Sequence, residues 1–514
     1  MSNLFDRFNA LRLTLRGRGG HLREVLGSLR RALRDVGLRV EEGPGGGLSV
    51  ASGAHVELFL AAELREGLRD VEVWWTGGAL SLGGERFRGK KPSPLGKLEG
   101  SRPEELLSGL FGLLCPTVVV ASNGHGEDAI AAAFMEFFRR SFPFVRVLAF
   151  PIVGDGLALS ERGFEVVSPL RPMPSGGLIK YSLRALYMDL KAGLLGLLLD
   201  QFRAMRDLSS GNKVLVCVGD VFLLAFVGLA SGLKPVLVST AKTVRLRGFY
   251  PFEVGVLRSM SGLVLTRDPE SASFLRGRGV EALYLGNPVM DVLGEMPIPR
   301  GVPSQSCGVL LLPGSRSSAY QDMGLLLDVA SRMVDDGFGG RFYCLVSRGL
   351  NLSAMLQGAI ERGFKVLQVG ERPCLCKGKT AVELWSGGLE HLVRRCSLVV
   401  GLGGTANQIC AGFGLPVVSV DDKARRVQKR LLGEAEVLVK RDAAEMAKVA
   451  LSVLRDPILY SHMSLSGMSN MGSPGCFRGM VDVFRSCGLG LLERMWVALS
   501  SASDETLAEG RRRP

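Results

Sequence analysis

Short apolar runs and helical patterns alternate along most of this chain, in two successive series. The first series opens with the valine-rich run 117–121 and continues to about residue 285, and the second extends from 309–312 to 416–420. Strands that alternate with helices build parallel sheets with helices on both faces. A chain of 514 residues is also too long for a single hydrophobic core. We therefore predict two doubly wound α/β domains.

The first 112 residues lack this alternation. Residues 11–36 have helical spacing with arginines on the polar side, and residues 86–103 are rich in Arg, Lys, Pro and Gly, as in a linker. Together with the strand patterns, this predicts a small α+β module of one helix and an antiparallel sheet. The basic helix could touch acidic lipid or RNA, or it could be a solvated face. The strand patterns lie at 48–51, 55–61, 71–75 and 79–82.

A proline-rich stretch, 291–307, separates the two series and is typical of an interdomain linker. Two Rossmann-like halves joined by one linker place a ligand cleft between the carboxyl ends of their sheets. The predicted fold class is therefore α/β, with two Rossmann-like domains facing a cleft and an N-terminal α+β module. The predicted boundaries are 1–112 for the module, 113–295 and 296–485 for the two Rossmann-like domains, and 486–514 for a C-terminal helix and tail.

The second series contains a glycine cluster between two buried strands. Residues 396–400 are typical of a strand, the cluster 401–404 interrupts it, and a helical pattern extends from Thr405 to about Gly412, before the next strand at 416–420. A strand, a glycine turn and a helix start can present backbone N–H groups to an anion. Thr405 can cap the helix, and its hydroxyl can also reach a ligand. A tight turn without a ligand is the alternative.

The net charge of +13 favours an anionic partner, such as a nucleotide, an acidic lipid surface or nucleic acid. An arginine-rich composition is the alternative explanation. Nucleic acid is the partner least favoured, because aromatic and basic residues are not interleaved. Cys374 and Cys376 form a lone C-x-C pair without a second pair at zinc spacing, so no metal site is predicted.

The compartment is predicted from two further observations. The N-terminus lacks the long apolar core of a signal peptide, which favours the reducing cytoplasm. The apolar stretch 214–233 carries Asp220 near its centre, where a charge in a bilayer would be costly. This stretch divides better into a strand, a turn and a helix, so we predict a soluble unit there.

Seven short motifs occur in order within residues 115–485. They resemble those of the lipid-A-disaccharide synthase-related family, which is similar to lipid A disaccharide synthase and, more distantly, to the peptidoglycan N-acetylglucosaminyltransferase. The resemblance does not cover the N-terminal module. The motifs are SNGHGED at 122–128, FPIVG at 150–154, VGD at 218–220, STAK at 239–242, GNPVMD at 286–291, LPGSR at 312–316 and GGTA at 403–406.

This resemblance implies a GT-B glycosyltransferase with an acceptor-binding N-terminal half and a UDP-sugar-binding C-terminal half. Such enzymes need no metal, and the UDP-sugar is a substrate, so no cofactor is implied. The implied reaction moves an N-acetylglucosamine-type sugar from UDP to a lipid-linked acceptor at the inner membrane surface. The protein would then be cytoplasmic, and peripheral attachment to the inner membrane is left open.

The donor site is assigned to two turns. In the synthase, LPGSR contacts the donor diphosphate; here the turn and the following helix start offer donors, and its arginine can form two hydrogen bonds to a diphosphate. The synthases place a glutamate for the donor ribose shortly after GGTA, whereas this chain has Asn-Gln-Ile at 407–409. A tryptophan at 385 lies near where a base would stack in GT-B proteins. A solvent-facing turn and a core tryptophan are the alternatives. The donor residues assigned are Gly314, Ser315, Arg316, Trp385, Gly403, Gly404, Thr405 and Gln408.

The acceptor site and the chemistry are assigned to the first series. An inverting transferase needs a group that takes the proton of the acceptor hydroxyl, and Asp220 at a strand end is the first candidate, followed by His125 and Asp155. The alternatives are a helix N-cap for Asp220 and a capping or loop histidine for His125. Lys242, with two arginines nearby, could bind an anionic acceptor or a leaving phosphate, or belong to a basic surface loop. The acceptor residues assigned are Ser122, Asn123, Gly124 and Lys242.

Two other functions remain compatible with these residues. The same fold could support a UDP-sugar 2-epimerase or hydrolase, although this chain has only five histidines. A nucleotide-sugar-binding protein without catalysis is favoured by the missing glutamate after GGTA.

Overall fold

A computed structural model defines the fold. The predicted strand at 79–82 and the candidate residues His125 and Asp155 lie outside the part of the chain that it describes. The structure describes residues 11–35, 37–42, 46–52, 55–64, 70–78, 94–99, 102–124, 126–154, 156–171, 183–208, 212–240, 242–246, 248–294, 308–347, 349–370 and 372–510.

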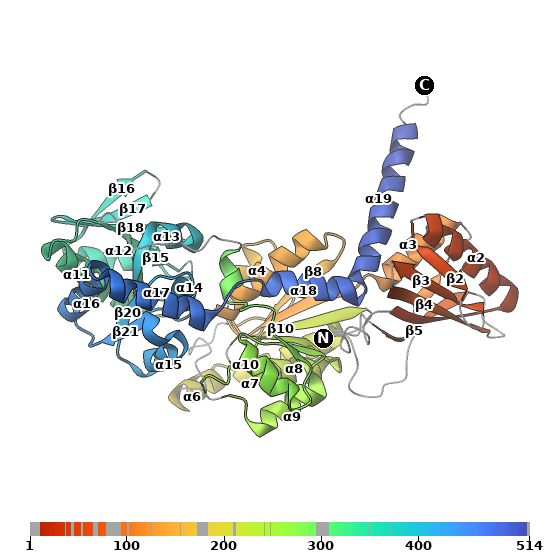
Figure 1. Ribbon diagram of the computed structural model, residues 1–514, viewed down its shortest axis with the longest axis horizontal. Coiled ribbons are helices and arrows are strands. Elements are labelled where there is room, and N and C mark those ends of the chain that lie inside the picture. The colour runs from red at the N-terminus through yellow and green to blue at the C-terminus, as the bar shows by residue number, and fades with distance from the viewer. Residues whose placement is uncertain are drawn as a thin grey trace.

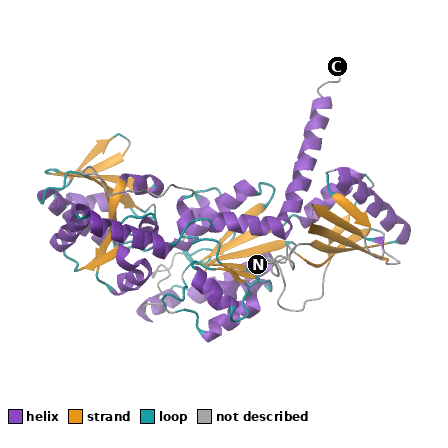
Figure 2. Ribbon diagram, in the orientation of Figure 1, coloured by secondary structure: helices purple, strands orange, loops and turns teal. Residues whose placement is uncertain are grey.

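Three sheets follow one another along the chain, and Figure 1 shows them as three bodies in a row. The N-terminal module lies at one end, the N-domain (117–294) in the middle and the C-domain (308–471) at the other end. Figure 2 shows the strands of the middle body lying between helices. The predicted α/β fold class, with two Rossmann-like domains and an N-terminal module that contains both helices and strands, is confirmed by these sheets.

The prediction of a helix over 11–36 is wrong at its start. β1 (Leu11–Gly17) is a central strand of the first sheet, parallel to β4 (His55–Leu64) and antiparallel to β5 (Val71–Gly78). Its sequence alternates leucine with polar residues, and Leu13 and Leu15 are fully buried. The sheet is therefore mixed rather than antiparallel. The other elements are α2 (Gly19–Asp35), β2 (Arg39–Glu42), β3 (Leu48–Ser52), β6 (Pro94–Leu98) and α3 (Pro103–Leu114).

Part of the predicted linker 86–103 belongs to the module. β6 pairs with β5, and α3 packs against both β6 and α2. Leu22, Leu29 and Leu33 of α2 are buried on the module's core side. Two of its arginines reach the edge strand β2, where Arg30 pairs with Glu42 and Arg34 donates to the Val40 carbonyl at 3.1 Å.

Seven parallel strands build the N-domain, as predicted, in the order β13-β12-β11-β10-β7-β8-β9. The order reverses between β7 (Thr117–Ser122) and β10 (Lys213–Gly219). Ligands of open α/β sheets bind outside the carboxyl ends of strands at such a switch point. The other elements are β8 (Arg146–Pro151), β9 (Glu165–Val166), β11 (Val236–Ser239), β12 (Leu263–Leu265), β13 (Ala282–Leu283), α4 (Gly126–Ser141), α5 (Leu157–Ser160), α8 (Val221–Ser231), α9 (Pro251–Met260), α10 (Pro269–Arg276) and η4 (Met290–Leu293).

The long helix predicted over 178–208 is two helices. α6 (Leu183–Lys191) and α7 (Leu194–Leu208) are separated at Gly193, whose φ of +94° ends the first helix. The stretch 214–233 divides into β10 and α8, as predicted. Within the described residues, no helix combines the length and the apolar character that crossing a membrane requires.

The C-domain sheet has the order β16-β17-β18-β15-β14-β19-β20-β21. Its switch point lies between β14 (Gly308–Leu312) and β19 (Cys396–Gly401), which pair in parallel. β16 (Lys365–Val369) and β17 (Arg372–Lys377) are antiparallel, and no strand was predicted at β17. The other elements are β15 (Arg341–Val346), β18 (Thr380–Ser386), β20 (Val417–Val420), β21 (Glu436–Val439), α11 (Ala319–Asp335), α12 (Leu352–Ile360), α13 (Leu389–Arg395), α14 (Thr405–Gly412), α15 (Lys423–Leu432), η5 (Gly433–Ala435) and α16 (Ala443–Arg455).

The chain returns to the N-domain after the C-domain is complete. α17 (Pro457–Met471) packs on the C-domain, and α18 (Cys476–Phe484) then lies against α4 of the N-domain (Figure 1). The ring of Phe477 meets that of Phe134 edge to face, with 5.6 Å between the centroids. A kinked segment, η6 (Arg485–Leu489), leads into α19 (Gly490–Gly510), which also touches α3.

Candidate functional site

Two glycine turns lie side by side at the switch point of the C-domain sheet. The backbone N–H of Leu402 donates to the carbonyl of Leu312 at 2.7 Å, which joins the turns that follow β14 and β19. Gly314 has a φ of +99°, which a residue with a Cβ adopts only with strain. A Cβ at Gly314 would lie 3.8 Å from the Cα of Gly403. The two turns that the sequence assigns to one diphosphate are therefore neighbours.

The polar groups of these two turns are open to solvent. Ser315, Arg316 and Gly404 are exposed, and no hydrogen bond or ion pair joins the Arg316 guanidinium to another residue that the structure describes. Helix α14 begins at the half-buried Thr405, with Gly404 as its N-cap and no side-chain cap. The prediction that Thr405 caps this helix is therefore wrong. The first backbone N–H groups of α14 can be satisfied by water or by an anion.

The two residues that follow this turn have different partners. Asn407 is fully buried, and its Nδ2 donates to the Gly401 carbonyl at 3.0 Å. Ser419 also donates to that carbonyl, at 2.6 Å, so both side chains fix the end of β19. Gln408, assigned to the donor ribose by the sequence, accepts a hydrogen bond from Arg267 of the N-domain at 3.3 Å.

Trp385 lies inside the C-domain. It is 5% exposed, and the Arg372 guanidinium carbon lies 3.8 Å from its ring centroid. Tyr343 meets it edge to face at 6.4 Å. Its role in base stacking stays a prediction, and a base would have to share the ring with Arg372.

The N-domain glycine turn is held by its own side chains. The buried Asp128 of α4 accepts hydrogen bonds from the Ser122 hydroxyl and from the Gly124 backbone N–H, the latter at 3.1 Å. Gly124 has a φ of +101°, and a Cβ there would lie 2.6 Å from the Val153 carbonyl oxygen. Asp128 thus fixes the turn. The assignment of Ser122 and Gly124 to an acceptor stays a prediction.

Asp220 lies at the carboxyl end of β10, on the N-domain switch point. Its Oδ1 accepts from the Leu223 N–H at 3.1 Å and caps α8, and the side chain is buried. A Cβ at the neighbouring Gly219 would lie 2.9 Å from the Asn123 Nδ2, so Asn123 packs across this strand end. Asp220 is therefore the N-cap of α8, which is the alternative that the sequence left open. Its role as a base stays a prediction.

Lys242 is engaged by its neighbours. Its Nζ lies 2.9 Å from Glu253 Oε1 and 4.8 Å from the ring centroid of Tyr250. Glu253 also accepts from the Tyr250 N–H at the start of α9. An anion would therefore compete with Glu253 for this ammonium group.

The glycine turns of the two domains meet each other. A Cβ added to Gly126, the first residue of α4, would lie 2.6 Å from the Thr405 Oγ1. The amino ends of α4 and α14 therefore approach from opposite domains. The first turn of α14 has no acidic residue, whereas that of α4 carries Glu127 and Asp128, so the amino end of α14 is the one with uncompensated partial positive charge for an anion.

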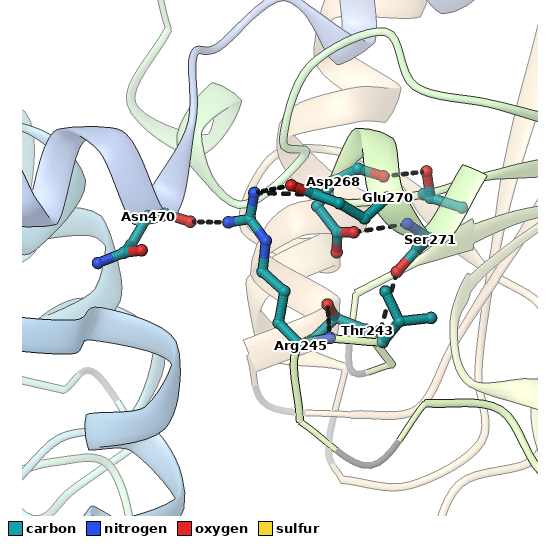
Figure 3. A network of polar contacts seen from close by, with 8 residues as sticks. Thr243, Arg245, Asp268, Glu270, Ser271 and Asn470 are labelled. Atoms are coloured by element: carbon teal, nitrogen blue, oxygen red, sulfur yellow. Dashed lines mark hydrogen bonds and ion pairs between the residues drawn. The ribbon is translucent and has the colours of Figure 1, made fainter. Parts of the chain in front are cut away.

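A polar network joins the N-domain to the end of α17, and Figure 3 shows it reaching across the boundary. Arg245 makes a two-fold contact with Glu270, at 2.8 and 2.9 Å, and donates to the Asn470 carbonyl at 2.9 Å. The contact with Arg245 lowers the pKa of Glu270 and the contact with Glu270 raises the pKa of Arg245. The other arginine near Lys242, Arg247, lies outside the described residues.

The sequence analysis missed Arg267, a second arginine at this boundary. It follows β12, is 6% exposed, and donates to the Thr240 carbonyl at 3.0 Å and to Gln408 at 3.3 Å. Its Nη2 also lies 3.9 Å from the Met471 Sδ. Burial lowers the pKa of Arg267 to about 10, so it remains charged at neutral pH. A polar triplet directly after a buried strand, Thr-Arg-Asp at 266–268, was the available signal.

The motif GNPVMD at 286–291 anchors the interdomain crossing. Asn287 donates from Nδ2 to the Met471 carbonyl at 2.7 Å, and its backbone N–H donates to Ser473 at 2.9 Å. Asp291 accepts from the N–H groups of Gly475 and Phe477 and so holds the start of α18. These motif residues fix the relative position of the domains.

Comparisons with known proteins leave the family open. No known family profile matches the chain, and no curated protein matches it. Solved structures similar to it include the UDP-GlcNAc 2-epimerase from Neisseria meningitidis bound to UDP-GlcNAc, at 12% identity and a TM-score of 0.41 over 71% of this chain and 99% of that one. The calicheamicin glycosyltransferase CalG4 is similar at 14% identity and a TM-score of 0.43, over 78% of this chain and 100% of that one.

The spinosyn rhamnosyltransferase SpnG, complexed with thymidine diphosphate, is similar at 14% identity and a TM-score of 0.45, over 71% of this chain and 98% of that one. Identities this low leave the substrate and the reaction to be argued from the chain's own residues.

Proposed function

We propose that this protein is a GT-B glycosyltransferase that moves an N-acetylglucosamine-type sugar from UDP to a lipid-linked acceptor. One observation carries the proposal: two glycine turns, with an exposed Arg316 and an uncapped α14, lie side by side at the switch point of the C-domain. Backbone N–H groups, a helix amino end and a guanidinium are the groups that bind a diphosphate.

The donor diphosphate would lie between the two turns. Gly314 and Gly403 let the phosphates approach the backbone, the N–H groups at the start of α14 donate to one phosphate, and Arg316 binds the other. Thr405 adds a hydroxyl at the point where Gly126 of the N-domain approaches. The donor would thus be bound where both domains contribute atoms.

In the proposed step, the acceptor hydroxyl oxygen attacks the anomeric carbon of the sugar. The bond from that carbon to the diphosphate oxygen breaks, UDP leaves with the electron pair, and the hydroxyl proton passes to a base. We assign the base to Asp220. Asp220→Asn keeps an oxygen for the α8 cap and removes the basic carboxylate, so turnover should fall at least about 100-fold without loss of folding. Unchanged turnover would remove Asp220 from the mechanism.

A lipid-linked acceptor is supported by apolar side chains exposed on neighbouring N-domain helices. α6, α7, α8 and α9 pack in succession, and Figure 1 shows α6, α7, α8 and α9 on one side of the middle body. Such a surface is typical of a protein that touches a membrane or a lipid chain. The most exposed members are Tyr187, Leu195, Leu199, Phe222 and Phe252.

Vesicle co-sedimentation tests this surface. Phe222→Ser with Phe252→Ser should abolish binding to vesicles of phosphatidylglycerol and phosphatidylethanolamine. The matched control is Ile458→Ser with Leu465→Ser, since both residues are also strongly exposed, at 83% and 62% against 56% and 70% for Phe222 and Phe252, but lie on the C-domain. Equal binding by the two double variants would contradict a lipid role for the N-domain surface.

Calorimetry with UDP and UDP-sugars, followed by turnover with membrane lipid extract, tests the reaction. The proposal expects binding, and sugar transfer only when extract is present. Turnover of the UDP-sugar alone would favour the epimerase or hydrolase. Binding without any turnover would favour a nucleotide-sugar-binding protein, and no binding would overturn the donor assignment.

A further inference from the structure

Arg267 is a buried cation, and its hydrogen-bond partners among the described residues are all neutral. They are a backbone carbonyl, the amide oxygen of Gln408 and the Met471 sulfur. The adjacent Asp268 raises the pKa of Arg267 through its charge, but Asp268 Oδ1 accepts from the Ser271 N–H at 2.7 Å. Buried charges in proteins are normally paired or bind a ligand. The second Asp268 oxygen, Oδ2, is buried without a hydrogen-bond partner, and no carboxylate among the described residues forms an ion pair with Arg267. The guanidinium is therefore open to an external anion.

Arg245 provides the comparison within the same boundary. It also bridges the two domains, and its partner Asn470 is the residue next to Met471. Unlike Arg267, Arg245 is neutralised by a two-fold contact with the Glu270 carboxylate (Figure 3). A contact between the domains can thus include its own ion pair, whereas Arg267 forms no ion pair with any carboxylate in the part of the chain that the structure describes.

The surroundings of Arg267 are those of the proposed donor site. Gln408 lies one helical turn beyond Gly404, at the uncapped amino end of α14. The hydroxyl of Thr240, whose carbonyl accepts from Arg267, is buried with no partner among the described residues. The amino end of α4 closes the same region through Gly126. The amino end of α14 and the Arg267 guanidinium are therefore two positive groups in one region, whereas the first turn of α4 already carries the carboxylates of Glu127 and Asp128.

We infer that Arg267 is a binding residue for the donor diphosphate, contributed by the N-domain. The inference rests on the proposed function and extends it, because it makes the N-domain a phosphate ligand of the nucleotide held by the C-domain. Arg267 stays within reach of α14 through Gln408, and its remaining N–H groups donate to a phosphate oxygen. Donor binding then draws the two domains together at this point.

The test compares Arg267→Met with Arg245→Met in the full chain. Calorimetry measures the dissociation constants of UDP and uridine, and thermal unfolding measures folding. A lost charge-assisted hydrogen bond to phosphate corresponds to about 10- to 100-fold in affinity. We expect Arg267→Met to weaken the binding of UDP by that factor and the binding of uridine by less than about two-fold. Arg245→Met should change neither affinity.

Arg267→Lys keeps the charge without the planar fork, so it covers the case in which Arg267→Met fails to fold. Its UDP affinity should lie between those of the wild type and the methionine variant. Equal UDP affinity of the wild type and a folded Arg267 variant would overturn the inference while leaving the donor site intact. An equal loss for UDP and uridine would assign Arg267 a structural role and also overturn it. Failure of the wild type to bind UDP would overturn the proposed function together with the inference.

Discussion

The carboxyl edges of the two parallel sheets differ in how their polar groups are used. At the N-domain edge, Asp128, Ser122 and Asp220 are buried and bonded to nearby backbone or to each other. At the C-domain edge, Arg316 and Gly404 are exposed, and α14 begins without a side-chain cap. The same topology thus yields a rigid edge and an open edge, and the open edge is the one suited to an external anion.

The largest effect is expected from breaking the rigid edge. Asp128→Ala leaves the Ser122 hydroxyl and the Gly124 N–H unpaired in the interior, so the free energy of unfolding should fall by about 4 kcal/mol. Urea unfolding measures it. Ser122→Ala removes only one donor and should cost about 1 kcal/mol. A similar cost for both variants would mean that Asp128 does not hold the turn.

A second prediction concerns Glu436, a buried carboxyl at the opposite, amino edge of the C-domain sheet. Burial raises its pKa from 4.5 to about 7, while Gln428 donates to its Oε1 at 2.8 Å. The folded state therefore binds more protons than the unfolded state between these values, and stability falls as pH rises through this window. Glu436→Gln removes this dependence. The free energy of unfolding that the variant gains over the wild type should therefore be about 3 kcal/mol larger at pH 8 than at pH 4.

Urea unfolding from pH 4 to pH 8 measures this difference between the wild type and Glu436→Gln. UDP affinity should be unchanged, because Glu436 lies on the edge away from the two glycine turns. A change in UDP affinity would break the assignment of ligand binding to the carboxyl edge.

Arg316→Ala tests whether the open edge of the C-domain sheet binds UDP. The exposed guanidinium supports no described contact, so stability should stay constant while UDP binds about 30-fold more weakly, equivalent to about 2 kcal/mol. Calorimetry measures the affinity and thermal unfolding the stability. Arg332→Ala, in the last turn of the helix α11 that follows the Arg316 turn, is the charge-matched control and should bind UDP as the wild type does.

The smallest effect is expected where the two edges touch. Gly126→Ala adds a Cβ that would lie 2.6 Å from the Thr405 Oγ1, so the turns must separate slightly. UDP affinity should fall about five-fold, equivalent to about 1 kcal/mol. Gly112→Ala is the matched control, since it is also helical but its Cβ would meet nothing within 4 Å. If both variants bind UDP like the wild type, the contact between the edges is not part of the site.

The spacing of apolar residues predicted most of the fold. The prediction failed where a strand pattern leads directly into a helix pattern. Parallel sheets and the strand-turn-helix at 214–233 follow from alternation and from glycine positions. At 11–17, leucines separated by single polar residues fit a strand. The prediction includes them in a helix because the helical pattern of α2 follows directly after them. The break at Gly193 was hidden because one glycine inside an apolar helical run is locally tolerated.

The candidate site was predictable only in its local parts. The turns at 313–316 and 403–405 are visible because each is a glycine turn after a strand. Their contact depends on β14 and β19 being neighbours, and the approach of Gly126 to Thr405 depends on how two domains pack. Arg267 was missed for the same reason, since its partner Gln408 lies in the other domain.

The return of the chain over the N-domain has a consequence for biosynthesis. Phe134 and Phe138 of α4 are made early, but the aromatic rings that cover them, Phe477 and Phe484, are made more than 300 residues later. During translation, this aromatic surface of the N-domain therefore stays uncovered until the C-terminal helices are made. An exposed aromatic surface is an aggregation hazard for nascent chains. A chaperone that binds exposed aromatic side chains would therefore recognise the nascent chain rather than the complete protein.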